Sequence, residues 1–431
     1  MKISLCKAQR FLIYCFAFLG PLGSIISPHF MPKALRGYHF LLLFSPFFLI
    51  RLKAKEWKTL LAFLPFFAYC LISAYFTENK PLEQEAAPFL RCGLLITQCL
   101  FMFGAAFCMR AAKIEIEKKR LLKLYLAGFF LSLIVGYILF WGYYAQKISF
   151  QDLSKWCVEA QAGWNFLRFS PGSYPNEYGN VSSFVLAILM LILAERKKPS
   201  PFLYLFIGMT FIALLLTTTR SAYLSFILTF FYLFLVSKPL RFTSLKFMTL
   251  SIICISLLQY YSFNFLYIFK EGIKKISLTG GSTGIRFTEW VKGFQEWAFS
   301  TFWGTGFGSQ IGVHNIYLEF LYELGIVGAV ILCITLLYYL SENSSKIRSI
   351  FSRKAMEQKD VLYNRITTVG LIHIFLFAGS NHNMHHHLTW FIFLFFNLSL
   401  FSESNSASSE PLSNDALPPS YKRPLSPQFL R

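Results

Sequence analysis

Two short polar stretches place an arginine beside an apolar run, where a fixed positive charge could bind an anion. Arg220 lies in 217–222, Thr-Thr-Thr-Arg-Ser-Ala, which separates two apolar runs. Arg286 follows the glycines of 280–284, and a glycine-rich turn that enters a helix can present backbone N–H groups to an anion. A guanidinium fork matches phosphate oxygens and stays charged at physiological pH, so the pair suits a diphosphate.

A third stretch, 313–319, offers a base. His314 and Asn315 stand directly before a long apolar run, so we expect His314 in the first turn of a helix. The positive end of the helix dipole disfavours an imidazolium ion there, and a neutral imidazole can accept a proton. The three stretches would then bring two fixed cations and one base to one surface.

Each stretch also has a purely structural interpretation. Arg220 could snorkel to lipid phosphates, since an arginine at the membrane is costly without an anionic partner. The stretch 280–308 could be a loop with a helix that lies on the bilayer, and His314 could simply cap its helix. The functional interpretation gains weight if all three lie on the same side of a membrane.

The composition indicates that most of the chain lies in lipid. Of 431 residues, 41 are Lys or Arg and 21 are Asp or Glu, a net charge of +20, yet only 14% are charged and 55% are hydrophobic, with 50 Phe. A typical globular domain is about 25% charged, and a soluble nucleic-acid-binding protein would carry its basic residues on a polar surface. That class is excluded, and we expect an all-α polytopic membrane protein with no nucleic-acid partner.

Apolar runs of helix length predict about 12 transmembrane helices, because one crossing needs roughly 20 apolar residues. Four runs are short, and we expect them to extend into polar flanks or to be re-entrant. The predicted spans are 11–27, 35–50, 59–76, 89–109, 121–145, 181–194, 201–216, 221–236, 247–269, 316–340, 361–379 and 388–401.

The distribution of Lys and Arg orients these spans. With the N-terminus inside, the segments on that side hold 27 Lys and Arg, against 12 in the opposite loops. The positive-inside rule then places both termini in the cytoplasm and the long loops 146–180 and 270–315 outside, where they would form the active-site face. We expect 1–401 to form one integral membrane domain and the Ser/Pro/Asn-rich segment 402–431 to be a disordered cytoplasmic tail.

Two further polar features have ordinary explanations. Arg91 lies near the outer start of its span, where it can snorkel. Histidines within His382–His387 could bind Zn²⁺ or Ni²⁺, but we interpret this cluster as an interfacial polar turn, with incidental metal binding or acceptor contact as alternatives. The acidic residues of the outer loops are scattered rather than spaced as metal ligands, so we expect neither a metal nor a cofactor.

The three stretches resemble the motifs of the O-antigen ligase family, the lipid A–core:surface polymer ligases, which are related to O-antigen polymerases and bacterial O-oligosaccharyltransferases. The matching positions are Thr217, Arg220 and Leu224 of Thr-x-x-Arg-x-x-x-Leu; Gly284, Arg286 and Trp290 of Gly-x-Arg-x-x-x-Trp; and His314, Asn315, Glu319, Gly325 and Gly328 of His-Asn-x-x-x-Glu…Gly-x-x-Gly. The stretch 171–179 resembles the family's Asn/Gly-rich entry to the next span. This chain departs from the family at 219–221, where it has Thr-Arg-Ser and many relatives have Ser-Arg-Gly. The departure keeps the arginine but changes its neighbours.

The resemblance implies a glycosyltransferase-C-like fold in the bacterial inner membrane, with a periplasmic loop domain between the ninth and tenth spans. It implies transfer of a glycan from undecaprenyl diphosphate to the lipid A–core oligosaccharide, without a metal. Arg220 and Arg286 would stabilise the leaving diphosphate, and His314 would assist removal of the acceptor's hydroxyl proton. The implied substrate-binding residues are Asn315, Glu319, Asn176 and Thr219.

Three alternatives are compatible with the same residues. An O-antigen polymerase would extend the glycan on its lipid carrier, whereas a protein-glycosylating relative, usually longer at its C-terminus, would use a protein acceptor. The dominant outer loop beside His314 and Asn315 favours the ligase, although the loop 146–180 keeps the polymerase open. A membrane transporter is the alternative from another class, but a transport path needs ionisable groups at mid-membrane, and the predicted spans contain almost none.

Overall fold

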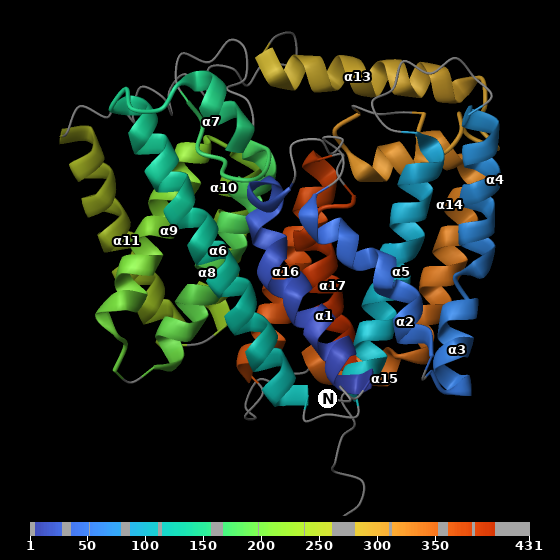
Figure 1. Cartoon of the computed structure of the whole chain (residues 1–431), viewed down its shortest axis with the longest axis horizontal. Helices are drawn as coiled ribbons and strands as arrows, with labels where there is room; N and C mark the ends of the chain where they lie inside the picture. Colours follow the sequence, from blue (N-terminus) through green and yellow to red (C-terminus); the bar gives the residue numbers. More distant parts are fainter. Residues whose placement is uncertain are drawn as a thin grey trace, which may run out of the picture.

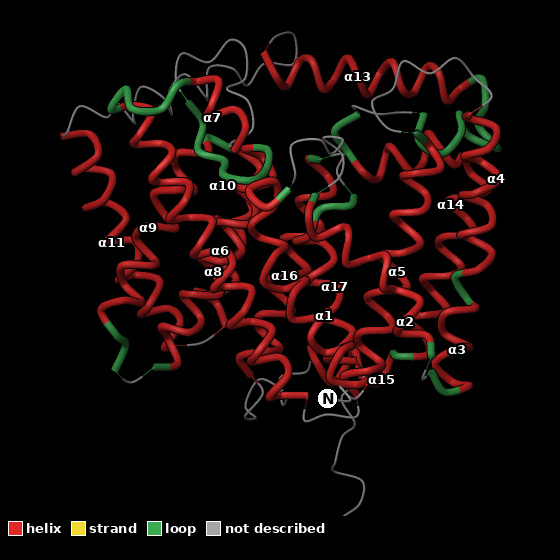
Figure 2. The backbone as a smooth tube through the Cα atoms, in the orientation of Figure 1, coloured by secondary structure: helices red, strands yellow, loops and turns green. Residues whose placement is uncertain are grey.

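Every regular element of the described residues is a helix in the computed structural model (Figure 1, Figure 2). The described residues are 5–27, 36–50, 52–78, 87–110, 114–156, 167–196, 198–236, 238–260, 281–309, 313–351, 361–381 and 384–400. Most helices run between two ends of a bundle, and α13 (Gly281–Ala298) lies across one of them, which we call the α13 end. The predicted tail 402–431 lies outside the described residues.

The helices have the following bounds. In chain order they are α1 (Leu5–Leu19), η1 (Gly20–Ile26), η2 (Gly37–Phe44), α2 (Ser45–Leu49), α3 (Ala54–Leu61), α4 (Leu64–Glu78), α5 (Pro88–Arg110), α6 (Ile114–Tyr144), α7 (Phe150–Trp156), α8 (Pro175–Glu195), α9 (Pro201–Thr217), α10 (Arg220–Val236), α11 (Lys238–Tyr260), α13, α14 (Ile316–Glu342), α15 (Ser344–Phe351), α16 (Val361–Ser380) and α17 (His387–Leu400). The symbol η marks a 3₁₀ helix.

Within the described residues, six helical segments are long and apolar enough to cross a membrane, which confirms the all-α, multi-pass class. They are Glu56–Thr77, Pro88–Met109, Ile116–Tyr144, Pro175–Glu195, Ile316–Glu342 and Leu362–Ser380. Shorter apolar helices are Gly37–Leu49, Pro201–Thr217, Arg220–Val236 and His387–Leu400. The two other predicted spans correspond to α1, which carries Lys7 and Arg10, and to α11, which carries Lys238, Arg241 and Lys246.

Some boundaries differ from the prediction. The span predicted at 181–194 begins six residues earlier, at Pro175, because the polar residues of this extension have partners inside the protein. The run 35–50 is a 3₁₀ helix followed by a short α-helix, with Pro46 in the first turn of α2, a position that proline favours. The described part of the span predicted at 247–269, residues 247–260, belongs to α11, which begins earlier, at Lys238; residues 261–269 lie outside the described residues.

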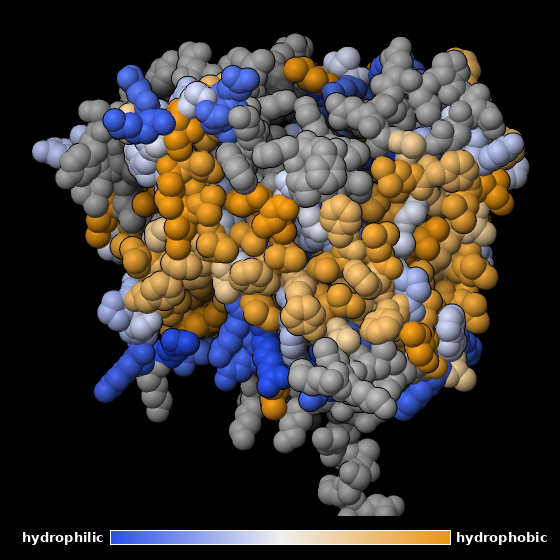
Figure 3. All heavy atoms as spheres, in the orientation of Figure 1, coloured by the Kyte–Doolittle hydropathy of each residue, from blue (hydrophilic) through white to orange (hydrophobic). Residues whose placement is uncertain are grey.

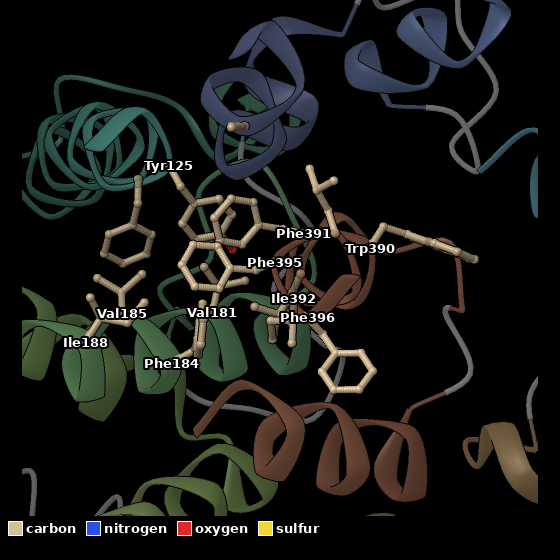
Figure 4. Packing of buried hydrophobic residues seen from close by; sticks show 14 of the residues in the cluster. Tyr125, Val181, Phe184, Val185, Ile188, Trp390, Phe391, Ile392, Phe395 and Phe396 are labelled. Atoms are coloured by element: carbon tan, nitrogen blue, oxygen red, sulfur yellow. The ribbon is translucent and has the colours of Figure 1, made fainter. Parts of the chain in front are cut away.

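The helices α8 and α17 lie in the core of the bundle. All residues of α8 from Val181 to Leu191 are buried. Tyr125 of α6 stacks on Phe391 of α17 with ring centroids 3.9 Å apart, and Figure 4 shows these rings beside Phe184 of α8. Helices that are apolar on all faces are expected at the centre of a membrane bundle, because every side meets another helix.

The outer surface is apolar as well. Figure 3 shows hydrophobic side chains in a broad band around the middle of the bundle, with hydrophilic side chains gathered below the band. Large apolar side chains on several helices are exposed, among them Leu235 of α10 (72%) and Ile334 of α14 (62%). An apolar surface of this extent is typical of a protein that contacts lipid.

The helix α14 is broken at Gly325, which has φ +63° and ψ −169°. The turn 301–306, which we call the glycine turn, pairs with the backbone on both sides of this break. The hydrogen bonds run from Thr305 N–H to Tyr322 O (2.9 Å), Gly306 N–H to Glu323 O (3.0 Å), Ile326 N–H to Thr301 O (3.0 Å) and Val327 N–H to Phe302 O (3.1 Å). This pairing satisfies backbone groups that the helix break leaves open, as a membrane environment requires.

We expect Gly325→Ala to destabilise the protein. A Cβ at this position would lie 2.4 Å from the Gly304 nitrogen and 2.4 Å from the Phe302 oxygen. The left-handed φ adds strain, so the free energy of unfolding should fall by about 1–3 kcal/mol or more. Thermal unfolding in detergent measures the change.

The matched control is Gly208→Ala, in the interior of α9. A Cβ there meets no heavy atom within 4 Å, and alanine favours a helix by up to about 1 kcal/mol over glycine. Its stability should be unchanged or slightly raised. Wild-type stability for Gly325→Ala would show that the break does not depend on glycine.

Candidate active site

A tight turn between α9 and α10 places Arg220 at the first position of α10. Thr218 ends α9 in the left-handed conformation, with φ +51°, and its N–H donates to the carbonyl of Leu215. The carbonyl of Thr219 accepts the N–H of Tyr223 (3.1 Å) and so starts α10. A β-branched residue with positive φ is rare, and such strain is often found at functional sites.

Arg168, which the sequence analysis did not single out, packs against this turn. Its Nε donates to the carbonyl of Thr217 (2.7 Å), and its Nη2 donates to Thr219 Oγ1 (3.0 Å) and Asn176 Oδ1 (3.3 Å). The residue is only 5% exposed. Its signal in the sequence is an arginine between apolar neighbours in 167–169, Leu-Arg-Phe, because a charge in such a segment needs a partner inside the protein.

The structure brings Arg286 of α13 into the electrostatic range of both Arg220 and Arg168. Burial lowers the pKa of Arg286. The nearby charge of Arg220 lowers the pKa of Arg286 further, whereas Glu289 raises it. Burial lowers the pKa of Arg168 to about 10; Tyr223 opposes this shift, and Arg286 and Arg220 add to it. Arg168 therefore remains charged at neutral pH.

We call these three residues the arginine cluster. The like charges of Arg168, Arg220 and Arg286 repel one another in a partly dehydrated site. A bound polyanion would relieve this repulsion. The arrangement therefore suits a ligand with several negative oxygens, such as a diphosphate.

His314 lies two residues before Ile316, the first residue of α14, so its predicted place in the first turn was wrong, whereas the helix starts where the span 316–340 was predicted to start. The φ of His314 is +52°, which makes it another left-handed non-glycine residue. The cap is Asn315, whose side-chain oxygen accepts the N–H groups of Tyr317 (3.1 Å) and Leu318 (3.2 Å). The capping role that we considered for His314 thus belongs to its neighbour.

The helix α13 connects His314 with the arginine cluster. Arg286 and Trp290 are four residues apart and therefore share a face of α13. Trp290 Nε1 donates to the carbonyl of Val313 (2.7 Å), the residue before His314, and Tyr322 of α14 donates its hydroxyl to the carbonyl of Trp290 (3.2 Å). One helix thus carries an arginine and holds the backbone that carries the histidine.

The predicted substrate-binding residues have partners within the protein. Asn315 caps α14, Asn176 accepts from Arg168, and the Thr219 hydroxyl contacts Arg168 and donates to the carbonyl of Pro175 (2.9 Å). The Glu319 carboxylate binds Arg91. Their contact with substrate stays a prediction, and these bonds favour a role in positioning the site.

Arg91 does not snorkel to the membrane surface, so that expectation was wrong. It is 7% exposed, and its guanidinium binds Glu319 and Glu323, with 3.1 Å from Nη1 to Glu323 Oε1. The two carboxylates lie one turn apart on the short part of α14 before Gly325, so they can hold one guanidinium inside the protein. This ion pair ties α5 to the half-helix that follows His314.

The interpretation of His382–His387 as an interfacial turn was also wrong, as far as this segment is described. His385, His386 and His387 are buried, whereas His382 and Asn383 lie outside the described residues. The turn is buried because α5, η2 and α8 supply polar partners for it. Across the described part of the chain, no group of three His, Cys, Asp or Glu side chains could hold a metal ion.

A known protein family matches the part of the chain that carries most of this site. The O-antigen ligase family model matches residues 202–333, from α9 into α14. The match includes Arg220, Arg286 and His314, while Arg168 lies before it. A search of curated proteins found no match. Over residues 202–333, the match supports an O-antigen ligase assignment, a family of membrane glycosyltransferase-like enzymes.

We expect Arg91→Met to lower the free energy of unfolding by about 3–5 kcal/mol, because two buried carboxylates lose their counter-charge. The variant that combines Arg91→Met with Glu319→Gln and Glu323→Gln should recover much of this loss, since no uncompensated charge remains. Thermal unfolding in detergent compares the two. If Arg91→Met is as stable as the wild type, the buried ion pair does not hold α14.

Proposed function

We propose that this chain transfers a glycan from undecaprenyl diphosphate to the lipid A–core oligosaccharide, on the periplasmic side of the bacterial inner membrane. The observation that carries the proposal is the arginine cluster at the α13 end, formed by Arg168, Arg220 and Arg286. The family match over two of these arginines adds support. In this orientation, the α13 end faces the periplasm and both termini face the cytoplasm.

The arginine cluster would act on the leaving group. As the bond between the anomeric carbon and the diphosphate oxygen breaks, negative charge grows on the diphosphate. Guanidinium groups that are already fixed and partly dehydrated stabilise this charge with little reorganisation. They supply the positive charge that a divalent cation would otherwise provide, so we propose a transfer without added metal.

His314 would act on the acceptor. The acceptor hydroxyl oxygen forms the new bond to the anomeric carbon, and its proton passes to the His314 imidazole. Undecaprenyl diphosphate leaves with the electron pair of the broken bond, and the imidazolium then releases its proton to water. The position of His314 just before α14, at the positive end of the helix dipole, favours return to the neutral ring.

The lipopolysaccharide profile of a deletion strain tests the function. A ligase predicts loss of all O-antigen from lipid A–core, together with accumulation of polymerised glycan on the carrier. A core that bears a single repeat unit would identify a polymerase instead. An unchanged profile would contradict both functions.

We expect Arg286→Lys to lose most transfer activity although the charge is kept. An ammonium ion cannot form the paired N–H contacts of a guanidinium, and one such contact is worth about 3 kcal/mol, or roughly 10²-fold in rate. Single-turnover transfer rates of the wild type and of Arg286→Lys, both in excess EDTA, measure the loss. The wild-type rate in EDTA also tests whether the reaction needs a metal. The control is Lys292→Ala on the same helix, whose ion pair with Glu296 is exposed and should not matter.

Near-normal turnover by folded Arg286→Lys would rule out paired contacts to the diphosphate. Loss of wild-type transfer in EDTA, with recovery on adding Mg²⁺, would rule out the metal-free reaction.

We expect His314→Ala to bind the donor but to transfer it slowly. The arginine cluster remains intact, whereas loss of a general base lowers the chemical rate by about 10²- to 10⁴-fold. Donor binding and single-turnover transfer are measured on the same preparation. Weakened donor binding with an unchanged chemical step would show that His314 is not the base.

A further inference from the structure

The first turn of α8 lies between two groups of buried polar residues. On one side, Asn176 holds Arg168 of the arginine cluster. On the other side, the Glu177 carboxylate is 3.8 Å from both Arg36 Nη2 and His386 Nε2, and Glu177 is only 1% exposed. The proposed reaction gives Glu177 no role.

Glu177 is held by groups that are distant in the sequence. Its Oε2 also accepts the N–H of Tyr174 (3.2 Å) at the start of α8, where the helix dipole favours a negative charge. Arg36 lies over the Tyr174 ring, with Cζ 5.5 Å from the ring centroid. A buried carboxylate is costly without a counter-charge, and the 8% exposed Arg36 provides it.

A buried histidine ring also lies near this carboxylate, although at 3.8 Å its Nε2 is beyond hydrogen-bond distance. His386 Nδ1 accepts the N–H of Leu388 (3.3 Å), so the proton of the neutral ring is on Nε2, the nitrogen nearest Glu177. We call residues 384–387 the histidine turn.

Three donors on η2 and α5 hold the histidine turn through one carbonyl oxygen. The carbonyl of His385 accepts from Gln98 Nε2 (3.0 Å), the Tyr38 hydroxyl (3.2 Å) and His39 Nε2 (3.3 Å). His39 is itself oriented, since its Nδ1 accepts the N–H of Arg36 (2.9 Å). Arg36 and the histidine turn are therefore parts of one network around Glu177.

On its other side, α8 contacts the turn that carries Arg220. Thr219 donates to the carbonyl of Pro175 (2.9 Å), and Asn180 Nδ2 lies 3.4 Å from Ser221 Oγ. Gly179 permits this approach, because a Cβ there would lie 2.9 Å from side-chain atoms of Thr217 and Thr219. A shift of this end of α8 would therefore move the supports of both Arg168 and Arg220.

We propose that Glu177 is a positioning residue for the diphosphate of the lipid-linked donor. Held between Arg36 and His386, its carboxylate fixes the first turn of α8, and that turn holds Arg168 and Arg220 against their mutual repulsion. The hydrogen bonds and the ion pair of this buried network join the first turn of α8 to Arg36 and the histidine turn to η2 and α5, and such contacts rigidify the elements that they join. The identity of the donor rests on the proposed function.

Glu177→Gln tests the role, because it keeps the shape of the side chain and removes its charge. We expect the Kd for undecaprenyl diphosphate and the donor KM to rise about 10-fold or more, since small displacements of binding groups have effects of this size. The acceptor KM should stay within about twofold of the wild type. Glu177→Asp, which retains the charge, should recover part of the loss.

His386→Asn is the second variant. Asparagine can still cap α17 as His386 Nδ1 does, but it loses the donor that faces Glu177. Its effect on the Kd should resemble that of Glu177→Gln. The double variant should raise the Kd little more than either single variant does, because both substitutions act through one contact.

The matched control is His373→Gln. His373 of α16 is also buried, and its Nε2 lies 2.8 Å from Ser183 Oγ of α8. Ser183 is six residues after Glu177, and thus further along α8 from the arginine cluster. Replacement of His373 should lower thermal stability without changing the Kd for undecaprenyl diphosphate.

Two results would overturn the positioning role. One is wild-type binding of undecaprenyl diphosphate by Glu177→Gln; the other is an equal rise in Kd for His373→Gln. Failure of the proposed function looks different, because the wild type itself would then bind no undecaprenyl diphosphate or transfer no glycan.

Discussion

Repulsion between the guanidinium groups of Arg168, Arg220 and Arg286 is the constraint on which this end of the protein depends. Three like charges in a partly dehydrated site separate unless their supports are rigid or an anion joins them. The supports of Arg168 and Arg220 are α8 and the turn between α9 and α10, joined by hydrogen bonds of Arg168 and Thr219, whereas Arg286 is carried by α13, which Trp290 ties to Val313. A site held in this way is ready for a polyanion before the anion arrives, which lowers the reorganisation needed during reaction.

The broken helix α14 meets a second requirement, which is to hold a histidine at the same end without leaving backbone groups unpaired. Gly325 breaks the helix, and the glycine turn pairs with the backbone on both sides. Arg91 then anchors the short half-helix through Glu319 and Glu323. Ionisable groups inside a membrane bundle are expensive and usually functional; here their contacts fix the segment that begins beside His314.

Much of the fold was predictable from local sequence. The composition and the long apolar runs predicted an all-α membrane protein, and ten of the predicted spans correspond to apolar helices. The errors lie where polar residues extend or interrupt these runs. The start of α8 was missed because Asn176 and Glu177 look like loop residues until their partners are known. The role of Thr305 and Gly306 was missed because their pairing with α14 joins separate segments.

Charge, hydropathy and short motifs are local properties, so the amino-acid sequence was enough to predict the lipid environment, the helical class and the motif residues Arg220, Arg286 and His314. Only the tertiary structure placed Arg168 with the other two arginines, gave Arg91 its carboxylate partners and buried the histidine turn around Glu177. The physical reason is the same in each case. A buried charge is stable only beside a partner, that partner lies on a different helix, and the packing of helices decides which ones meet.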